Sequence, residues 1–118
     1  NDLMIARKYL IPLRKEFLEI KNRGKFINSQ SFSVIVAKNN FAYPRFAIIV
    51  GKKNFKLSVT RHKIKRQIAD AITSLKIPNG DYIFIAKKEI LDAARLDSIE
   101  SKRARMTLRN EINNLVFN

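Results

Sequence analysis

Four segments between residues 31 and 87 constrain the fold more than any other feature of the chain. Three of them, residues 31–38, 45–51 and 81–87, are short runs rich in β-branched and aromatic residues, which is typical of buried strands. The fourth, residues 64–75, repeats apolar side chains at i, i+4, i+7, i+8 and i+11 and therefore predicts an amphipathic helix. A strand–strand–helix–strand order lets the helix cover one face of a small sheet.

Two further helices are expected at the ends of this unit. Residues 13–23 carry apolar side chains at helical spacing and are followed by Gly24, which is typical of a helix that ends at a glycine. A last helix is expected from about residue 97 to residue 116. Asn39 and Pro44 separate the first two strand segments and predict a strand pair joined by a turn. The expected fold class is an α+β sandwich, with helices against a small mixed sheet in the order α-β-β-α-β-α.

Length and composition limit the remaining choices. A chain of 118 residues suits one domain, and no repeat or linker divides it, so residues 1–118 are expected to form a single domain. Because cysteine is absent, a disulfide framework, a thiolate metal site and a thiol nucleophile are excluded. No apolar run approaches the ~20 residues of a membrane helix, and no secretion signal is visible. We therefore expect a soluble, cytoplasmic protein without a membrane partner.

The chain is strongly basic, and its charge is unevenly distributed. It has 24 Lys and Arg against 10 Asp and Glu, a formal net charge of +14. Between Glu19 and Asp70 there are twelve Lys and Arg and no acid. Solvated surfaces normally mix both signs, so this segment indicates a polyanionic partner, with nucleic acid as the first choice. A membrane surface fits less well, because a basic membrane-binding helix usually exposes Trp, Phe or Leu, and the chain has no Trp.

The most informative segment is residues 52–72, where basic residues meet the start of the predicted helix. Ser58 or Thr60 can accept hydrogen bonds from the free N–H groups of the first turn, so the helix is expected to begin there. Helical spacing places Arg61 on the core-facing side but beyond the end of the core, so it is expected to point at a ligand. Other cations lie on the flank or the opposite side: Lys63, Lys65 and Arg66. Cations at a helix N-terminus are unfavourable by roughly 0.3–1 kcal/mol each, so their clustering predicts a bound anion such as phosphate.

The same segment resembles the signature of the bacterial ribonuclease P protein subunit. The residues that carry the resemblance are GKK at 51–53, a seven-residue spacer, and RHKIKRQI at 61–68. Two other segments resemble the family in order and spacing: LRKEFLEIKNRGK at 13–25 and DYIFIAKK at 81–88. The chain departs from the family signature at His62 and Lys63, where Asn and Arg are usual, and at Ala69-Asp70, where a further Arg is common. Lys for Arg keeps the charge but loses the bidentate fork that binds phosphate.

The resemblance implies a small basic cofactor protein for a catalytic RNA that removes the 5′ leader from precursor tRNA. The chemistry would then belong to the RNA and to Mg²⁺ bound mainly by that RNA, with no cofactor intrinsic to the protein and one protein per RNA. It also implies a left-handed β-α-β crossover, as in the second domain of a small-subunit ribosomal protein, against the usual right-handed rule.

The resemblance also assigns candidate site residues. Contacts to the catalytic RNA are expected from the signature region: Lys52, Lys53, Arg61, His62, Lys63, Lys65 and Arg66. A cleft between the first helix and the sheet is expected to bind the leader through Phe17, Lys21, Ile35 and Lys87. For Phe17 an alternative stays open, because Leu13, Phe17 and Ile20 equally form a core stripe.

Three other functions agree less well with the sequence. A protein-borne nuclease site is disfavoured, because the chain has one histidine and its carboxylates are thinly spread, so neither an acid–base pair nor a two-metal site is indicated. A non-enzymatic RNA-binding protein of the ribosomal-protein type would have the same charge and core, and it is the main alternative. A sequence-specific DNA binder would need a helix-turn-helix pair or a dimer seam, and neither is visible.

Overall fold

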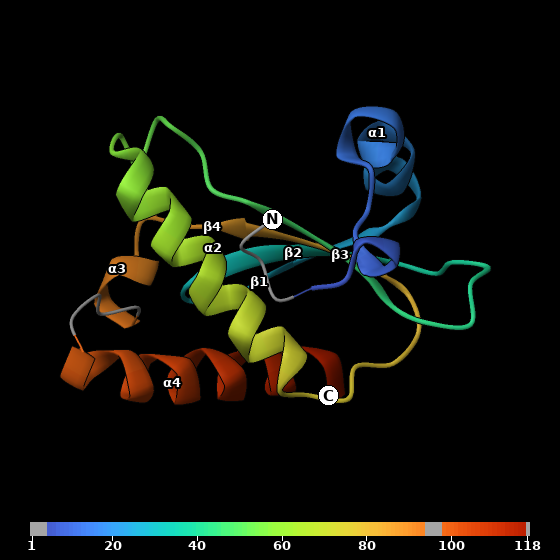
Figure 1. Cartoon of the computed structure of the whole chain (residues 1–118). Coiled ribbons are helices and arrows are strands. Elements are labelled where there is room, and N and C mark those ends of the chain that lie inside the picture. The colour runs from blue at the N-terminus through green and yellow to red at the C-terminus, as the bar shows by residue number, and fades with distance from the viewer. Residues whose placement is uncertain (1–4, 94–97, 118) are drawn as a thin grey trace.

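The computed structural model describes residues 5–93 and 98–117, in which four strands form one mixed sheet (Figure 1). The strands are β1 (Lys25–Asn28), β2 (Phe32–Ala37), β3 (Arg45–Ile49) and β4 (Asp81–Ala86). Across the sheet the order is β1-β2-β4-β3, with antiparallel pairs β1/β2 and β2/β4 and a parallel pair β3/β4. The helices are η1 (Arg7–Tyr9), α1 (Leu13–Arg23), α2 (Ser58–Thr73), α3 (Ile90–Ala93) and α4 (Ser98–Phe117). The expected α+β fold class is confirmed.

The helices divide between the two faces of the sheet, and each face has its own core. Helices α2 and α4 pack on one face, where the larger core includes Phe32, Val34, Phe84, Ile64, Ile68, Leu108 and Ile112. Helix α1 packs on the other face, where the smaller core consists of Ile11, Ile20, Ile35, Ala37, Ala47 and Ile83. Successive side chains of β2 and β4 point in turn into the larger and the smaller core, so both faces of these central strands are buried where helices cover them. No described helix is long and apolar enough to cross a membrane.

The predicted pairing of the first two strand segments is wrong. Strands β2 and β3 do not pair with each other, because β4 lies between them. The physical reason is burial: residues 81–84 are all buried, which requires a central position, whereas Ile48 and Ile49 of β3 are only half-buried. Helix α2 therefore connects the adjacent parallel strands β3 and β4. The left-handed sense of this crossover stays a prediction.

Three short elements were not expected from the sequence. Strand β1 is an edge strand in which only Ile27 is half-buried, so it has no apolar alternation to reveal it. Elements η1 and α3 have three and four residues, too few to show helical periodicity. The expected helices at 13–23 and from about residue 97 are confirmed as α1 and α4.

Gly24 joins α1 to β1 at a place where a side chain has no room. A Cβ atom there would lie 2.7 Å from the Ile20 carbonyl oxygen and 2.8 Å from Cγ2 of Ile35. We expect Gly24→Ala to lower the free energy of unfolding by about 1–3 kcal/mol in urea titrations, because backbone or core atoms must shift. Gly51→Ala is the matched control, since a Cβ at Gly51 meets nothing within 4 Å. Equal losses in the two variants would contradict the close packing of α1 on β2.

Candidate nucleic-acid interface

The first turns of α2 present an exposed basic surface. His62, Lys63 and Arg66 are exposed and, with Ser58 and Val59, line a shallow depression on the outer side of the helix. Two apolar side chains are unusually exposed beside these cations, Leu57 at 69% and Val59 at 63%. Lys52 and Lys53, in the segment before the helix, are also exposed. The structure thus brings most of the expected signature residues onto accessible surface at one end of α2.

The start of α2 agrees with the expectation, but its capping does not. The helix begins at Ser58, as expected, yet Leu57 occupies the N-cap position and no side chain caps the first turn. The predicted capping by Ser58 or Thr60 is therefore wrong, because Ser58 already lies inside the helix.

Arg61 does not point freely at a ligand. Its Nη1 donates hydrogen bonds to the carbonyl oxygens of Phe55 (2.8 Å) and Lys56 (2.9 Å), and the side chain is half-buried. Arg61 therefore fixes the segment that leads into α2, which corrects the expectation that its position on the helix aims it at an anion. Lys65 is also half-buried, so Lys63 and Arg66 are the most accessible cations of the signature helix.

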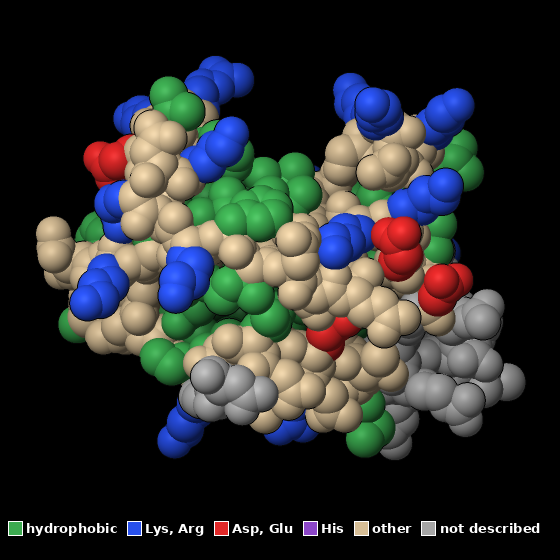
Figure 2. All heavy atoms as spheres, turned by 180° about the vertical axis from the view of Figure 1, so that it is seen from behind, with side chains coloured by type: hydrophobic (Ala, Val, Ile, Leu, Met, Phe, Trp, Pro, Cys, Tyr) green, Lys and Arg blue, Asp and Glu red, His purple; other side chains and the backbone are tan. Residues whose placement is uncertain are grey.

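A hollow lies between α1 and the segment leading into α2, and Figure 2 shows it as an apolar floor between two lobes that carry Lys and Arg. The strand register assigns Phe26, Ile49 and Ile85 to this face of the sheet, and Ile49 and Ile85 pack against the smaller core. Phe26 is 58% exposed, and Ile49 and Ile85 are half-buried. An apolar floor between basic walls suits a flexible single strand of nucleic acid, which carries negative phosphates and flat bases.

One side of α1 faces this hollow. Residues 14, 17, 18 and 21 follow the i, i+3, i+4, i+7 spacing and therefore share one side of the helix. Glu16 and Arg23 lie on the opposite side, where they bind residues at the first positions of β3 and β4. Lys21 is exposed and Phe17 is half-buried against the smaller core, so Phe17 combines core packing with a position at the edge of the hollow. Arg14 and Leu18, which the sequence did not single out, belong to the same side.

Two of the expected leader contacts have structural roles in this arrangement. Ile35 is 1% exposed beneath α1 and packs in the smaller core, so the helix that was expected to form one wall of the cleft covers it; its contact with the leader stays a prediction. Lys87 is half-buried, and its Nζ donates a hydrogen bond to the Ser29 carbonyl oxygen at 2.6 Å, which ties the end of β4 to the β1–β2 turn.

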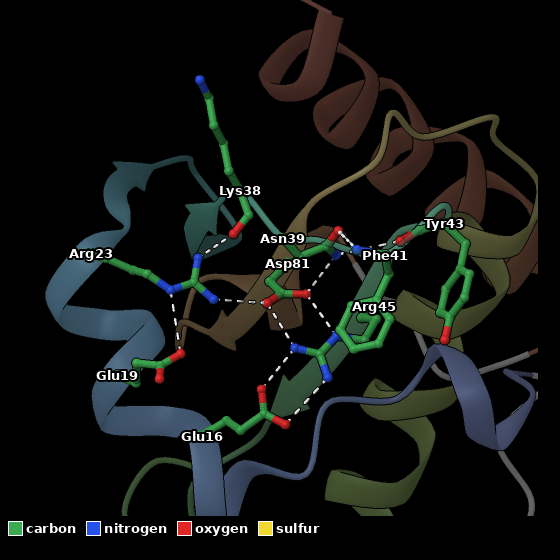
Figure 3. A network of polar contacts seen from close by, with 9 residues as sticks. All are labelled: Glu16, Glu19, Arg23, Lys38, Asn39, Phe41, Tyr43, Arg45 and Asp81. Carbon is green, nitrogen blue, oxygen red and sulfur yellow. Dashed lines mark hydrogen bonds and ion pairs between the residues drawn. The ribbon is translucent and has the colours of Figure 1, made fainter.

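Between α1 and the first residues of β3 and β4 lies a buried ionic network that the sequence did not reveal (Figure 3). Arg45 is 6% exposed and binds Asp81 through Nε (2.9 Å) and Nη2 (2.8 Å), while its Nη2 also binds Glu16 at 2.8 Å. Asp81 is fully buried and also accepts hydrogen bonds from Asn39 (2.9 Å) and Arg23 (3.3 Å). The network joins α1 to the first residues of β3 and β4 and thereby fixes one wall of the hollow.

The network shifts the ionisation of its members. Burial alone would raise the pKa of Asp81, but hydrogen bonds from Arg45 and Asn39, together with the charges of Arg45 and Arg23, hold that pKa below its ordinary value. Hydrogen bonds to Asp81 and Glu16 raise the pKa of Arg45 above its ordinary value. Arg45 belongs to the acid-free basic segment of the sequence, yet its charge is neutralised by acids from outside that segment.

The described residues contain no group of three or more His, Cys, Asp or Glu that could hold a metal ion. The expectation that Mg²⁺ is bound mainly by an RNA partner is a separate statement and stays a prediction.

Comparison with known proteins gives a consistent result. The family model described as Ribonuclease P matches residues 5–113. The chain is similar to the ribonuclease P protein component of Vibrio vulnificus, with 36% identity over 94 residues that cover 78% of this chain and 80% of that protein. It is 33% identical over 88 residues to the same component of Thermotoga maritima, covering 72% and 74% of the two chains.

Solved structures show the same similarity. The RNase P protein from Thermotoga maritima superposes with a TM-score of 0.75 at 30% identity, covering 90% of this chain and 93% of that one. The Staphylococcus aureus RNase P protein, at 24% identity, shares the fold with a TM-score of 0.69, covering 93% and 98%.

Proposed function

Because the chain belongs to the ribonuclease P protein family, we propose that it binds both the catalytic RNA of a ribonuclease P holoenzyme and the 5′ leader of precursor tRNA. Membership of this family makes the chain a tRNA-processing component that works with an RNA subunit in a ribonucleoprotein. The observation that carries the finer proposal is the pair of adjoining surfaces, a basic helix start on α2 and a hollow with an apolar floor between basic walls.

The catalytic RNA is assigned to the exposed side of the first turns of α2. Lys63 and Arg66 are exposed, and Lys52 and Lys53 extend the positive charge into the preceding segment. Such cations neutralise phosphates and release counterions, which gives affinity without reading sequence. The exposed Leu57 and Val59 can pack against sugar or base surfaces beside those phosphates.

The leader is assigned to the hollow. A leader is a single strand, so its bases are free to lie on an apolar floor while its phosphates contact the walls. Phe26 offers an exposed ring on that floor, and Lys21 and Arg14 on α1 offer exposed cations. Phe17 lies at the edge of the same surface, and Lys87 organises the turn at its far end.

Cleavage itself is assigned to the RNA subunit and Mg²⁺, and the protein positions the two RNAs. The protein then contributes binding and orientation, which can lower a reaction barrier by holding the reacting groups in place.

The test of the α2 surface compares two double variants with the same change in charge. Lys63→Ala/Arg66→Ala removes two exposed cations from the depression on α2, whereas Lys76→Ala/Arg109→Ala removes one exposed Lys beyond the other end of α2 and one exposed Arg on α4. We expect the first variant to weaken binding to the catalytic RNA by about 1–3 kcal/mol per contact and to reduce the salt slope by about one unit per cation. We expect a much smaller effect from the second variant. Equal effects in filter-binding titrations over a salt series would show that α2 is not the RNA surface.

A further inference from the structure

The loop between β2 and β3 holds an exposed aromatic ring in a fixed position. Phe41 is 44% exposed, which is costly for so large an apolar side chain. The loop is nevertheless well anchored: the Phe41 backbone N–H donates to Oδ1 of Asn39 at 3.0 Å, and Nδ2 of Asn39 donates to the buried Asp81 at 2.9 Å (Figure 3). The ring is therefore presented at the surface by hydrogen bonds that reach the interior.

The Phe41 ring also packs against the side chain of Arg45. The guanidinium carbon of Arg45 lies 4.4 Å from the Phe41 ring centroid, and Arg45 itself is held by Asp81 and Glu16. Because the ion pairs fix the guanidinium, they also fix the ring that lies on it. A partner that stacks on the exposed part of Phe41 would therefore lose little conformational entropy from the protein.

Two tyrosines extend this surface. The Tyr43 ring lies 5.4 Å from Phe41 in a tilted arrangement and 5.3 Å from Tyr9 in an edge-to-face arrangement. Nζ of Lys8 lies 5.0 Å from both tyrosine rings. Tyr9 and Tyr43 also line a recess of about 480 Å³, which is within the range of small-ligand sites. We call Tyr9, Phe41 and Tyr43 the aromatic platform.

The charges around the platform favour a polyanion. Arg7, Lys8 and Lys38 are exposed, and none of them forms an ion pair among the described residues. Figure 3 shows the Lys38 side chain extending away from the network. The nearby carboxylates are already engaged, since Glu16 and Asp81 bind Arg45 and Glu19 binds Arg23. Aromatic rings beside unpaired cations are the elements with which proteins hold single-stranded nucleic acid.

We propose that the aromatic platform stacks against an unpaired RNA base while Lys8 and Lys38 contact the adjacent phosphates. The site is separate from the surfaces discussed above: the loop precedes the first residue of β3, whereas the segment leading into α2 follows the last. The proposal rests on the proposed function only in taking RNA as the polyanion.

The test uses the full chain and a short single-stranded oligoribonucleotide that carries the fluorescent adenine analogue 2-aminopurine, whose emission falls when it stacks. We expect wild-type protein to quench this emission and Phe41→Leu to bind on the order of tenfold more weakly with most of the quenching lost. Phe41→Trp should restore both, because it keeps a ring on Arg45. Lys8→Ala/Lys38→Ala should weaken binding and reduce its salt dependence.

Several results would overturn the platform. The platform is contradicted if wild-type protein does not quench the 2-aminopurine emission, or if Phe41→Leu quenches it as strongly as wild type does. Another contradicting result is an equal loss in Phe41→Leu and Phe41→Trp accompanied by lower melting temperatures, because that pattern would mean that Phe41 only packs the loop. Failure of the platform proposal can be distinguished from failure of the proposed function, because binding of the catalytic RNA is measured separately with the Lys63→Ala/Arg66→Ala variant.

Discussion

Asp81→Ala is expected to lower the free energy of unfolding by about 3–5 kcal/mol, the largest loss of stability that we expect from any single substitution. The carboxylate is fully buried and holds Arg45 through two hydrogen bonds at 2.9 and 2.8 Å. Its removal leaves Glu16 as the remaining ionic partner of the buried Arg45 guanidinium, and it takes away the hydrogen bonds that Asn39 and Arg23 donate to Asp81. Urea unfolding followed by circular dichroism measures the loss.

Two further variants make this result interpretable. Asp81→Asn keeps an acceptor oxygen and the shape of the side chain, so it should fold and lose less stability than Asp81→Ala. Glu19→Ala removes a carboxylate that is 70% exposed and pairs with Arg23 at 3.4 Å, so we expect a change within about 0.5 kcal/mol. If Asp81→Ala cost no more than Glu19→Ala, the ionic network would not be what holds α1 on the sheet.

The same carboxylate makes stability depend on pH in a defined direction. Since folding lowers the pKa of Asp81, the ionised group contributes stability that is fully present above its unfolded pKa of about 3.9 and is lost as the pH falls through the folded value. The wild type should therefore lose stability below about pH 4, and Asp81→Asn should lose less over the same interval. An identical acid dependence in the two proteins would assign the loss to other carboxylates.

The sequence predicted the elements that have strong periodicity and missed the relations between them. The stripe from Ile64 to Leu75 is visible because α2 buries one side against the sheet. The position of β4 between β2 and β3 depends on which strand buries both faces, and that is a property of the whole core rather than of neighbouring residues.

The sequence also predicted only part of the candidate site. The family and the accessible cations Lys63 and Arg66 follow from a local pattern, and the family is confirmed by the comparisons. The roles of Arg45 and Arg61 could not be predicted, because an arginine that binds a distant carboxylate or a loop carbonyl has the same sequence appearance as one that binds phosphate. One signal was available for Arg45: it directly adjoins the apolar residues of its strand segment, where an unpaired charge would be costly.

Adding this protein to a ribonuclease P RNA at low Mg²⁺ is expected to speed 5′ cleavage of precursor tRNA by about tenfold or more. The physical reason is charge: under the proposed function, the protein's cations contact phosphates that Mg²⁺ would otherwise have to neutralise, and they also hold the leader in the hollow. The advantage should therefore shrink as Mg²⁺ is raised, and it should be smaller for a substrate whose leader is too short to reach the hollow.

The most direct test is this single-turnover cleavage assay, with labelled precursor tRNA and saturating RNA subunit, in the presence and absence of the protein. We expect a product with the mature 5′ end, formed faster with wild-type protein than with RNA alone and more slowly with Lys63→Ala/Arg66→Ala than with Lys76→Ala/Arg109→Ala. Cleavage at the same rate with and without the protein over the whole Mg²⁺ series would contradict the proposed function.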